Sequence, residues 1–171
     1  MIDRIFIEQG DITLQNVQAI VNAANKTLLG GGGVDGAIHR IAGPELLTEC
    51  KSLNGCNTGE AKMTKGYNLS AKYVIHTVGP VWNGGNGKEA ELLTNCYKNC
   101  LGLVVKHGIE SIAFPAISTG VYSYPLDEAC FIAINETLNF FNRNDPIEKI
   151  VFVCFDDLNF KTYQSTLAKF K

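Results

Sequence analysis

Residues 22–39 read N-A-A-N-K-T-L-L-G-G-G-G-V-D-G-A-I-H, and the rest of the chain is arranged around them. They follow the apolar run Ala-Ile-Val at 19–21, whose length and β-branched content predict a buried strand. The glycine run Gly30–Gly33 then leads into a segment with a helical pattern. Glycines at this place let the backbone adopt positive φ and approach a ligand closely. The free N–H groups at the start of the next helix favour an anion, most often a phosphate.

Polar side chains gather around the same turn. Asn22 and Asn25 stand at the end of the predicted strand, and Asp35 and His39 lie one helical turn apart on the segment that follows. A glycine run by itself is commonly just a flexible turn, but the polar residues beside it favour a ligand site. His39 either positions the first loop or is a satisfied, partly buried histidine, and we favour the second interpretation.

A second loop of this kind covers residues 115–125, which read P-A-I-S-T-G-V-Y-S-Y-P. Ser118, Thr119 and Gly120 offer hydroxyl groups and an unhindered backbone. Pro125 suits the first turn of a following helix. The triplet Ser-Thr-Gly alone is weak evidence, because it is often an ordinary turn. Two such loops together predict a diphosphate held between them.

Strands and helices alternate along the sequence, which predicts an α/β layered domain with a mostly parallel sheet. Ligands bind such sheets at the carboxyl ends of the strands, so the loops after the first strand, Val21, Phe114 and Val153 should line one crevice. The strands are expected at residues 2–8, 19–23, 60–67, 72–78, 111–114 and 149–155. The helices are expected at residues 35–41, 44–53, 89–107, 125–141 and 160–170.

The composition is that of an ordinary globular protein, with 46% hydrophobic and 19% charged residues, and the length predicts one domain over residues 1–171. The net charge of −2 gives no basic footprint for a nucleic acid, so backbone N–H groups must hold an anionic ligand. No apolar run reaches membrane-spanning length, and the N-terminal residues do not look like a signal peptide, which predicts a cytoplasmic protein. Nothing suggests an obligate dimer, and we expect a monomer.

The six cysteines contain no C-x-x-C pair. Cys96 and Cys100 stand four residues apart in a predicted helix, a spacing that could supply two metal ligands. Reduced cysteines more commonly act as small core residues. We therefore expect neither a metal nor a cofactor.

Five motifs, spread in order over nearly the whole chain, resemble those of the macro domain family. They are G-D-I-T at 10–13, V-N-A-A-N at 21–25, G-G-G-G-V-D-G-A-I-H at 30–39, H-T-V-G-P at 76–80 and F-P-A-I-S-T-G-V-Y at 114–122. Within the family the chain is similar to the MacroD-type branch, which includes bacterial O-acetyl-ADP-ribose deacetylases. The resemblance implies a three-layer α/β/α sandwich around a mixed, mostly parallel sheet, with ADP-ribose in a cleft.

The resemblance also implies roles for individual residues. Asp35 matches the catalytic acid of the hydrolytic branch, and Asn25 matches the residue that fixes the distal ribose. Asp11 matches the acceptor for the adenine amino group, with the backbone of Ile12 nearby, and Phe155 matches the aromatic residue on the adenine ring. The matches in and before the two phosphate loops are Asn22, Gly31, Gly32, Gly33, Val34, Ser118, Thr119, Gly120, Val121 and Tyr122.

The function that this implies is hydrolysis at the distal ribose of ADP-ribose esters, with Asp35 orienting the attacking water. The expected substrates and partners are O-acetyl-ADP-ribose and proteins mono-ADP-ribosylated on Asp or Glu. Two alternatives share the cleft: a non-catalytic ADP-ribose reader, and a phosphatase for ADP-ribose phosphorylated on the distal ribose. An NAD-dependent dehydrogenase is disfavoured, because Gly30–Gly33 is not the G-x-G-x-x-G pattern. Ser123 departs from the glycine usual in the family and puts the flexibility of the second loop in doubt.

Overall fold

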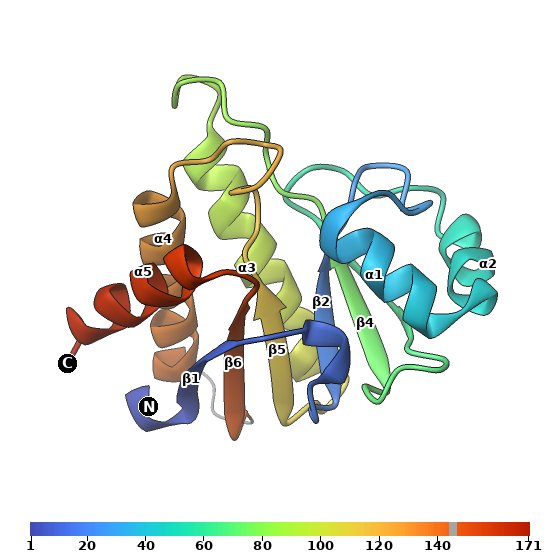
Figure 1. Ribbon diagram of the computed structural model, residues 1–171, viewed down its shortest axis with the longest axis horizontal. Coiled ribbons are helices and arrows are strands. Elements are labelled where there is room, and N and C mark those ends of the chain that lie inside the picture. The colour runs from blue at the N-terminus through green and yellow to red at the C-terminus, as the bar shows by residue number, and fades with distance from the viewer. Residues whose placement is uncertain (144–146) are drawn as a thin grey trace.

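The computed structural model describes residues 1–143 and 147–171 (Figure 1). The strands are β1 (Ile5–Gln9), β2 (Ala19–Ala23), β3 (Ala61–Lys65), β4 (Tyr73–Thr77), β5 (Ser111–Pro115) and β6 (Lys149–Cys154). The helices are α1 (Gly33–Ala42), α2 (Pro44–Ser52), α3 (Glu89–Lys106), α4 (Leu126–Arg143) and α5 (Asp157–Ala168). Short 3-10 helices form η1 (Ile2–Arg4) and η2 (Ile12–Leu14).

The described strands form one sheet in the order β1-β6-β5-β2-β4-β3. Every neighbouring pair is parallel except β3 and β4, which are antiparallel. The prediction of a mixed, mostly parallel sheet is therefore confirmed. Because β1, β6, β5, β2 and β4 run the same way, their carboxyl ends meet at one edge of the sheet (Figure 1).

Helices cover both faces of the sheet. Along β6, Ile150 and Phe152 pack with α3, α4 and α5, whereas Val151 and Val153 belong to the cluster under α1 and α2. Strands buried on both faces read as continuous apolar runs, because helices on either side exclude water. This is the three-layer α/β/α arrangement that the resemblance to the macro domain family implied. None of the helices in the described part of the chain is long and apolar enough to cross a membrane.

The starts of two elements, β1 and α5, differ most from the sequence-based expectation. Residues 2–4 form η1 rather than the start of a strand, and Asp3 pairs with the N-terminal ammonium group at 2.7 Å. Helix α5 begins earlier than residue 160, because the Asp156 carboxylate accepts a hydrogen bond from the Asn159 backbone at 2.8 Å and caps it. Both differences depend on local polar contacts that hydrophobic periodicity does not report.

All six cysteines are free and buried. Burial raises the pKa of the Cys96 thiol to about 11, and this thiol contacts the Val78 carbonyl oxygen at 3.3 Å. Cys100 is fully buried in the core cluster beside α4. These thiols are protonated at neutral pH and pack as small core groups, as predicted.

Candidate functional site

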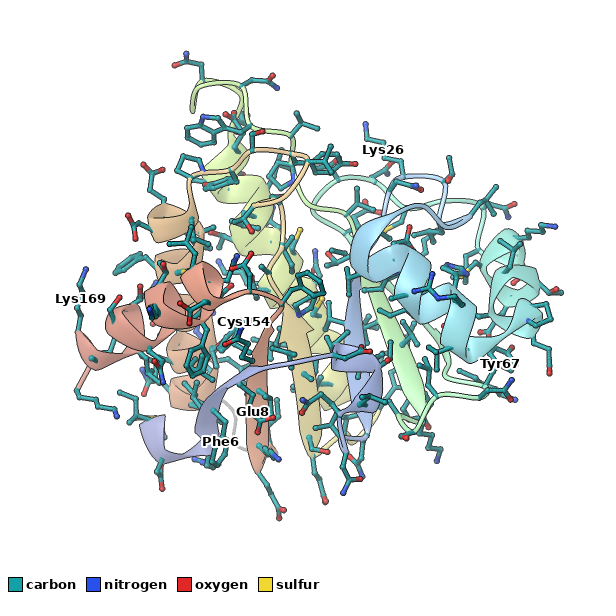
Figure 2. All side chains as sticks on the ribbon, in the orientation of Figure 1. Phe6, Glu8, Lys26, Tyr67, Cys154 and Lys169 are labelled. Atoms are coloured by element: carbon teal, nitrogen blue, oxygen red, sulfur yellow. The ribbon has the colours of Figure 1, made fainter. Side chains whose placement is uncertain are left out.

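The loops singled out in the sequence follow β1, β2, β5 and β6, at the edge where the parallel strands end. The backbone N–H of Gly10 donates to the Cys154 carbonyl oxygen at 2.9 Å and joins the ends of β1 and β6. Figure 2 marks Cys154, the last residue of β6, and Lys26, which lies in the loop after β2. The strand order places these loops side by side at one edge of the sheet, and the crevice that they are expected to line stays a prediction.

The first glycine loop leads directly into α1. Helix α1 begins at Gly33, and no side chain caps its N-terminus at Gly32. Gly31, Gly32 and Gly33 are exposed, and Val34 is half-buried. A methyl group at Gly36 would lie 2.5 Å from the Gly31 carbonyl oxygen, so only glycine lets loop and helix pack this closely. The first N–H groups of α1 are thus left for an anion at the positive end of the helix dipole.

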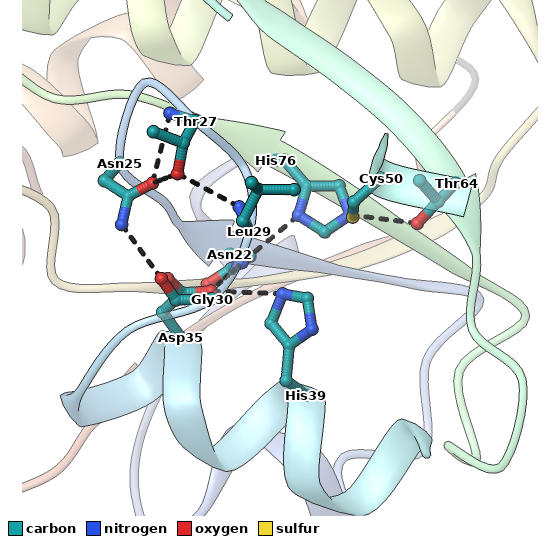
Figure 3. Close-up of polar contacts among 10 residues, drawn as sticks. All are labelled: Asn22, Asn25, Thr27, Leu29, Gly30, Asp35, His39, Cys50, Thr64 and His76. Carbon is teal, nitrogen blue, oxygen red and sulfur yellow. Dashed lines mark hydrogen bonds and ion pairs between the residues drawn. The ribbon is translucent and has the colours of Figure 1, made fainter. Parts of the chain in front are cut away.

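Asn25 shapes this loop from within (Figure 3). Its Nδ2 donates to the Gly30 carbonyl oxygen at 3.0 Å. Its Oδ1 accepts from the Thr27 backbone at 3.2 Å and from the Thr27 hydroxyl at 2.6 Å. The Thr27 hydroxyl in turn accepts from the Leu29 backbone at 3.2 Å. The Asn25 side chain is half-buried beside the glycines that it holds in place.

Asp35 lies in the first turn of α1 and is only 5% exposed. Its Oδ1 accepts a hydrogen bond from Asn22 Nδ2 at 2.8 Å and lies 3.4 Å from His39 Nε2. Its Oδ2 faces the glycine loop, because a methyl group at Gly31 would lie 3.2 Å from it. Within residues 1–143 and 147–171 no hydrogen bond reaches Oδ2. One carboxylate oxygen is therefore anchored, and the other is available at the glycine loop.

His39 contacts the site without a full hydrogen bond. Its Nε2 is buried and has no hydrogen-bond partner among the described residues, although it lies near Asp35. The ring packs beneath Gly30, where a methyl group would meet its carbon atoms at 3.8 Å. Of the two interpretations of His39, the structure favours a histidine that supports both the loop and the carboxylate.

A row of buried polar side chains extends from Asp35 through Asn22 to His76 and Thr64 (Figure 3). Asn22 is 0% exposed, and its Nδ2 also lies 3.1 Å from His76 Nδ1. The other ring nitrogen, His76 Nε2, lies 2.9 Å from the Thr64 hydroxyl and 3.8 Å from Cys50 Sγ. Burial, and to a lesser degree His39, lowers the pKa of His76 to about 3, so its ring is neutral. Asn22, which the resemblance grouped with the ligand-binding residues, thus lies under Asp35 as its support.

The second loop follows β5. Ser118 has a φ of 66° and is 8% exposed, and its buried hydroxyl has no hydrogen-bond partner among the described residues. A methyl group at Gly79 would lie 2.1 Å from that hydroxyl, so Gly79 permits this close packing. The loop closes through hydrogen bonds from Tyr124 N to Ser118 O at 2.9 Å and from Ser123 N to Gly120 O at 3.0 Å. Exposed or half-buried loop residues are Thr119, Gly120, Val121 and Tyr122.

A third loop, residues 78–88, packs against the second loop. The glycines in it predict a surface loop, but the sequence did not show its contacts with the second loop. The Trp82 backbone donates to the Tyr122 carbonyl oxygen at 2.9 Å, and the rings of Trp82 and Tyr124 lie 4.8 Å apart. The buried Glu89 carboxylate accepts hydrogen bonds from the backbone N–H groups of Asn83, Gly85 and Gly87. Nothing in the sequence distinguishes this glutamate from the exposed ones around it.

Asp11, Ile12 and Phe155 lie at the ends of β1 and β6. Asp11 Oδ1 accepts from the Thr13 backbone at 2.9 Å and from the Thr13 hydroxyl at 2.7 Å, and so caps η2. Ile12 is buried under α1, whereas the Phe155 ring is 91% exposed. Three strand steps separate β1 from β2, a span of roughly 14 Å. The edge of the sheet where the parallel strands end thus carries the exposed Phe155 ring on one side and the buried Asp35 carboxylate on the other. The second loop lies between them.

The comparisons with known proteins agree on one family. The model of the family described as the Macro domain matches residues 21–133. The chain is 52% identical to the O-acetyl-ADP-ribose deacetylase of Salmonella newport, covering 99% of this chain and 97% of the relative. It is also 52% identical to the human ADP-ribose glycohydrolase MACROD2, covering 98% of this chain and 40% of that longer protein.

A solved structure gives the same result. The Trypanosoma brucei macrodomain in complex with ADP-ribose superposes with a TM-score of 0.90 at 48% identity, covering 95% of this chain and 68% of that chain. Sequence motifs, strand order and overall fold therefore agree, and the chain belongs to the macro domain family.

Proposed function

We propose that this chain is a hydrolase that binds ADP-ribose and cleaves esters at its distal ribose. The reactions are the deacetylation of O-acetyl-ADP-ribose and the removal of mono-ADP-ribose from Asp or Glu side chains of proteins. The support is the arrangement of the edge loops, together with near full-length similarity to a deacetylase and, over a shorter part of that protein, to an ADP-ribose glycohydrolase.

The edge offers a place for each part of an extended ligand. Phe155 presents an exposed ring for the adenine, and the free oxygen of Asp11 and the Ile12 backbone lie at the neighbouring strand end for the adenine amino group. The N-terminus of α1 and the second loop would hold the diphosphate through backbone N–H groups, which suits a chain with a net charge of −2. Asn25 would hold the first loop against the distal ribose.

The observation that carries the proposal is the geometry of Asp35. Its Oδ1 is anchored by Asn22 at 2.8 Å, while its Oδ2 faces the glycine loop where the distal ribose would lie. A carboxylate held in this way can orient a water molecule and accept its proton as the water attacks the ester. General base catalysis of this kind contributes on the order of 10²–10⁴-fold, and positioning of the water adds to it. The chemistry calls for no metal or cofactor.

The test compares the wild type with Asp35→Ala on a protein mono-ADP-ribosylated on glutamate, measuring the ADP-ribose released. Glu45→Ala, which removes an exposed carboxylate from the first turn of α2, is the matched control. We expect release by the wild type and the control, and little release by Asp35→Ala. ADP-ribose affinity, measured by calorimetry, should stay within a few-fold in all three.

Other outcomes point to other functions. Tight ADP-ribose binding without release by any variant would make the chain a reader, and parallel assays on an acetyl ester and a phosphate ester separate the deacetylase from the phosphatase. Loss of binding together with turnover in Asp35→Ala would make Asp35 a binding residue. The proposal extends to a monomeric, cytoplasmic protein whose residues 1–171 act as a single domain on free and protein-linked ADP-ribose.

A further inference from the structure

The amide of Asn22 makes two contacts through one nitrogen. Nδ2 carries two hydrogens, and its two partners are Asp35 Oδ1 at 2.8 Å and His76 Nδ1 at 3.1 Å. Asn22 and His76 stand opposite each other on the neighbouring strands β2 and β4. The sheet register therefore brings a histidine ring nitrogen to the amide that anchors the Asp35 carboxylate.

The remaining atom of this amide shows that its orientation is not accidental. Asn22 Oδ1 is buried and has no hydrogen-bond partner among the described residues. A buried acceptor without a partner is costly and needs an explanation. Turning the amide over would place Oδ1 against the Asp35 carboxylate, and two negative oxygens would then face each other. In the observed orientation both N–H groups of Asn22 Nδ2 have acceptors, and only Asn22 Oδ1 has no partner among the described residues.

His76 can accept from Asn22 only in one tautomer. Because Nδ1 accepts, the proton of the neutral ring lies on Nε2, and it points to the Thr64 hydroxyl oxygen at 2.9 Å. In the other tautomer Nδ1 would carry the proton and would require Asn22 Oδ1 as its acceptor. Thr64, on β3 beside β4, supplies the acceptor that this tautomer needs at Nε2.

We propose that His76 is a positioning residue, fixed by Thr64, that holds the Asn22 amide with its nitrogen toward Asp35. The carboxylate is thereby held with Oδ1 anchored and Oδ2 directed at the glycine loop. This inference rests on the proposed function insofar as Asp35 is the group that orients the water. His76 and Thr64 act on the reaction through Asn22 without touching the ligand.

The titratable groups around Asp35 allow this row to be tested without changing a charge. His39 faces Asp35 from its own helix, His76 faces it through Asn22 from β4, and Cys50 lies on α2. Burial, followed by the charges of Asp35 and Glu49, raises the pKa of Cys50 to about 11, so the thiol is neutral. Thr64→Val removes only an uncharged hydroxyl that is three contacts away from the carboxylate, through His76 and Asn22.

The experiment measures the titration midpoint of the Asp35 carboxyl by carbon NMR and the tautomer of His76 by nitrogen NMR, in parallel with the pH dependence of ester hydrolysis. The variants are Thr64→Val, Thr64→Ser and Thr137→Val. Thr137 is the matched control, because its buried hydroxyl donates to the Ala133 carbonyl oxygen within α4, away from the site.

We expect the Nε2-protonated tautomer in the wild type. Thr64→Val should raise the measured Asp35 midpoint relative to the wild type, since a carboxylate that loses a hydrogen bond is more easily protonated. The acid limb of kcat should move with it, while ADP-ribose affinity stays within about threefold. Thr64→Ser and Thr137→Val should match the wild type.

An Asp35 midpoint that does not move in Thr64→Val, or that moves equally in Thr137→Val, would overturn the inference, as would an Nδ1-protonated His76 in the wild type. The NMR measurements need no turnover, so they separate this inference from the proposed function. A midpoint that moves in Thr64→Val while no variant hydrolyses an ester would support the role of His76 and refute the hydrolase.

Discussion

Replacing Gly31 by alanine would place a methyl group beside the carboxylate oxygen that is proposed to orient the water. The added carbon would lie 3.2 Å from Asp35 Oδ2 and 3.5 Å from Asn25 Nδ2. The first of these contacts is tighter than a relaxed one, so one of the two groups must move by a few tenths of an ångström. Asp35 is restrained, because Oδ1 is bonded to Asn22 at 2.8 Å.

The methyl group therefore occupies the side of Oδ2 from which a water would be bound. A misplacement of about 1 Å costs on the order of 100-fold in rate. The shift of Asp35 is smaller than that, and the methyl group also obstructs the water, so we expect kcat to fall by about 10- to 100-fold in Gly31→Ala. The fold should tolerate the change, since Gly31 is exposed and does not have a positive φ. We expect Tm to shift by less than about 4 °C, equivalent to about 1 kcal/mol for a chain of this size.

Single-turnover release of ADP-ribose at saturating enzyme gives the chemical rate, and calorimetry gives the affinity for ADP-ribose. Gly102→Ala is the control, because a methyl group at this exposed position in α3 meets no atom within 4 Å. A Gly31→Ala rate within twofold of the wild type, at unchanged affinity, would show that the attacking water does not bind at Oδ2. The assignment of Asp35 as the water-orienting group would then be wrong.

Phe155→Ala should lower ADP-ribose affinity by about 10- to 100-fold in calorimetry, because stacking of a base on an aromatic ring is worth about 1–3 kcal/mol. Its Tm should not change, since the ring is 91% exposed, and unchanged affinity would exclude stacking. Burial tends to raise the pKa of Glu89, but bonds from Asn83, Gly85 and Gly87 outweigh it and lower the pKa below its ordinary value of 4.5. The ionised Glu89 carboxylate therefore orders these three backbone amides above pH 4.5. The ordering is lost as the pH falls through the lowered pKa of Glu89 in the folded protein. Hydrogen exchange at these amides should accelerate in that range, and in Glu89→Gln at neutral pH; exchange unaffected by Glu89→Gln would refute this role.

The sequence was sufficient for most of the fold. The apolar run before Asn22 predicted β2 within the bounds observed, Ala19–Ala23, because a central parallel strand is apolar on both faces. The alternation of strands and helices predicted a mostly parallel sheet, and the glycine run predicted free N–H groups at the start of the next helix, which is α1. The start of α5 was missed, because its cap at Asp156 is a single local hydrogen bond.

The sequence also named the candidate residues at the edge of the sheet, since loops after parallel strands converge whatever their spacing in the chain. It did not show what lies beneath them. Asn22, Thr64 and His76 come from three strands, and only the register of β2, β4 and β3 brings their side chains into one buried row. Hydrophobic periodicity reports which face a residue occupies but carries no information about its partner on another strand. The sequence therefore identified the loops. The orientation of the Asp35 carboxylate was decided by packing between distant segments, because hydrogen bonds depend on distances that exist only in the folded chain.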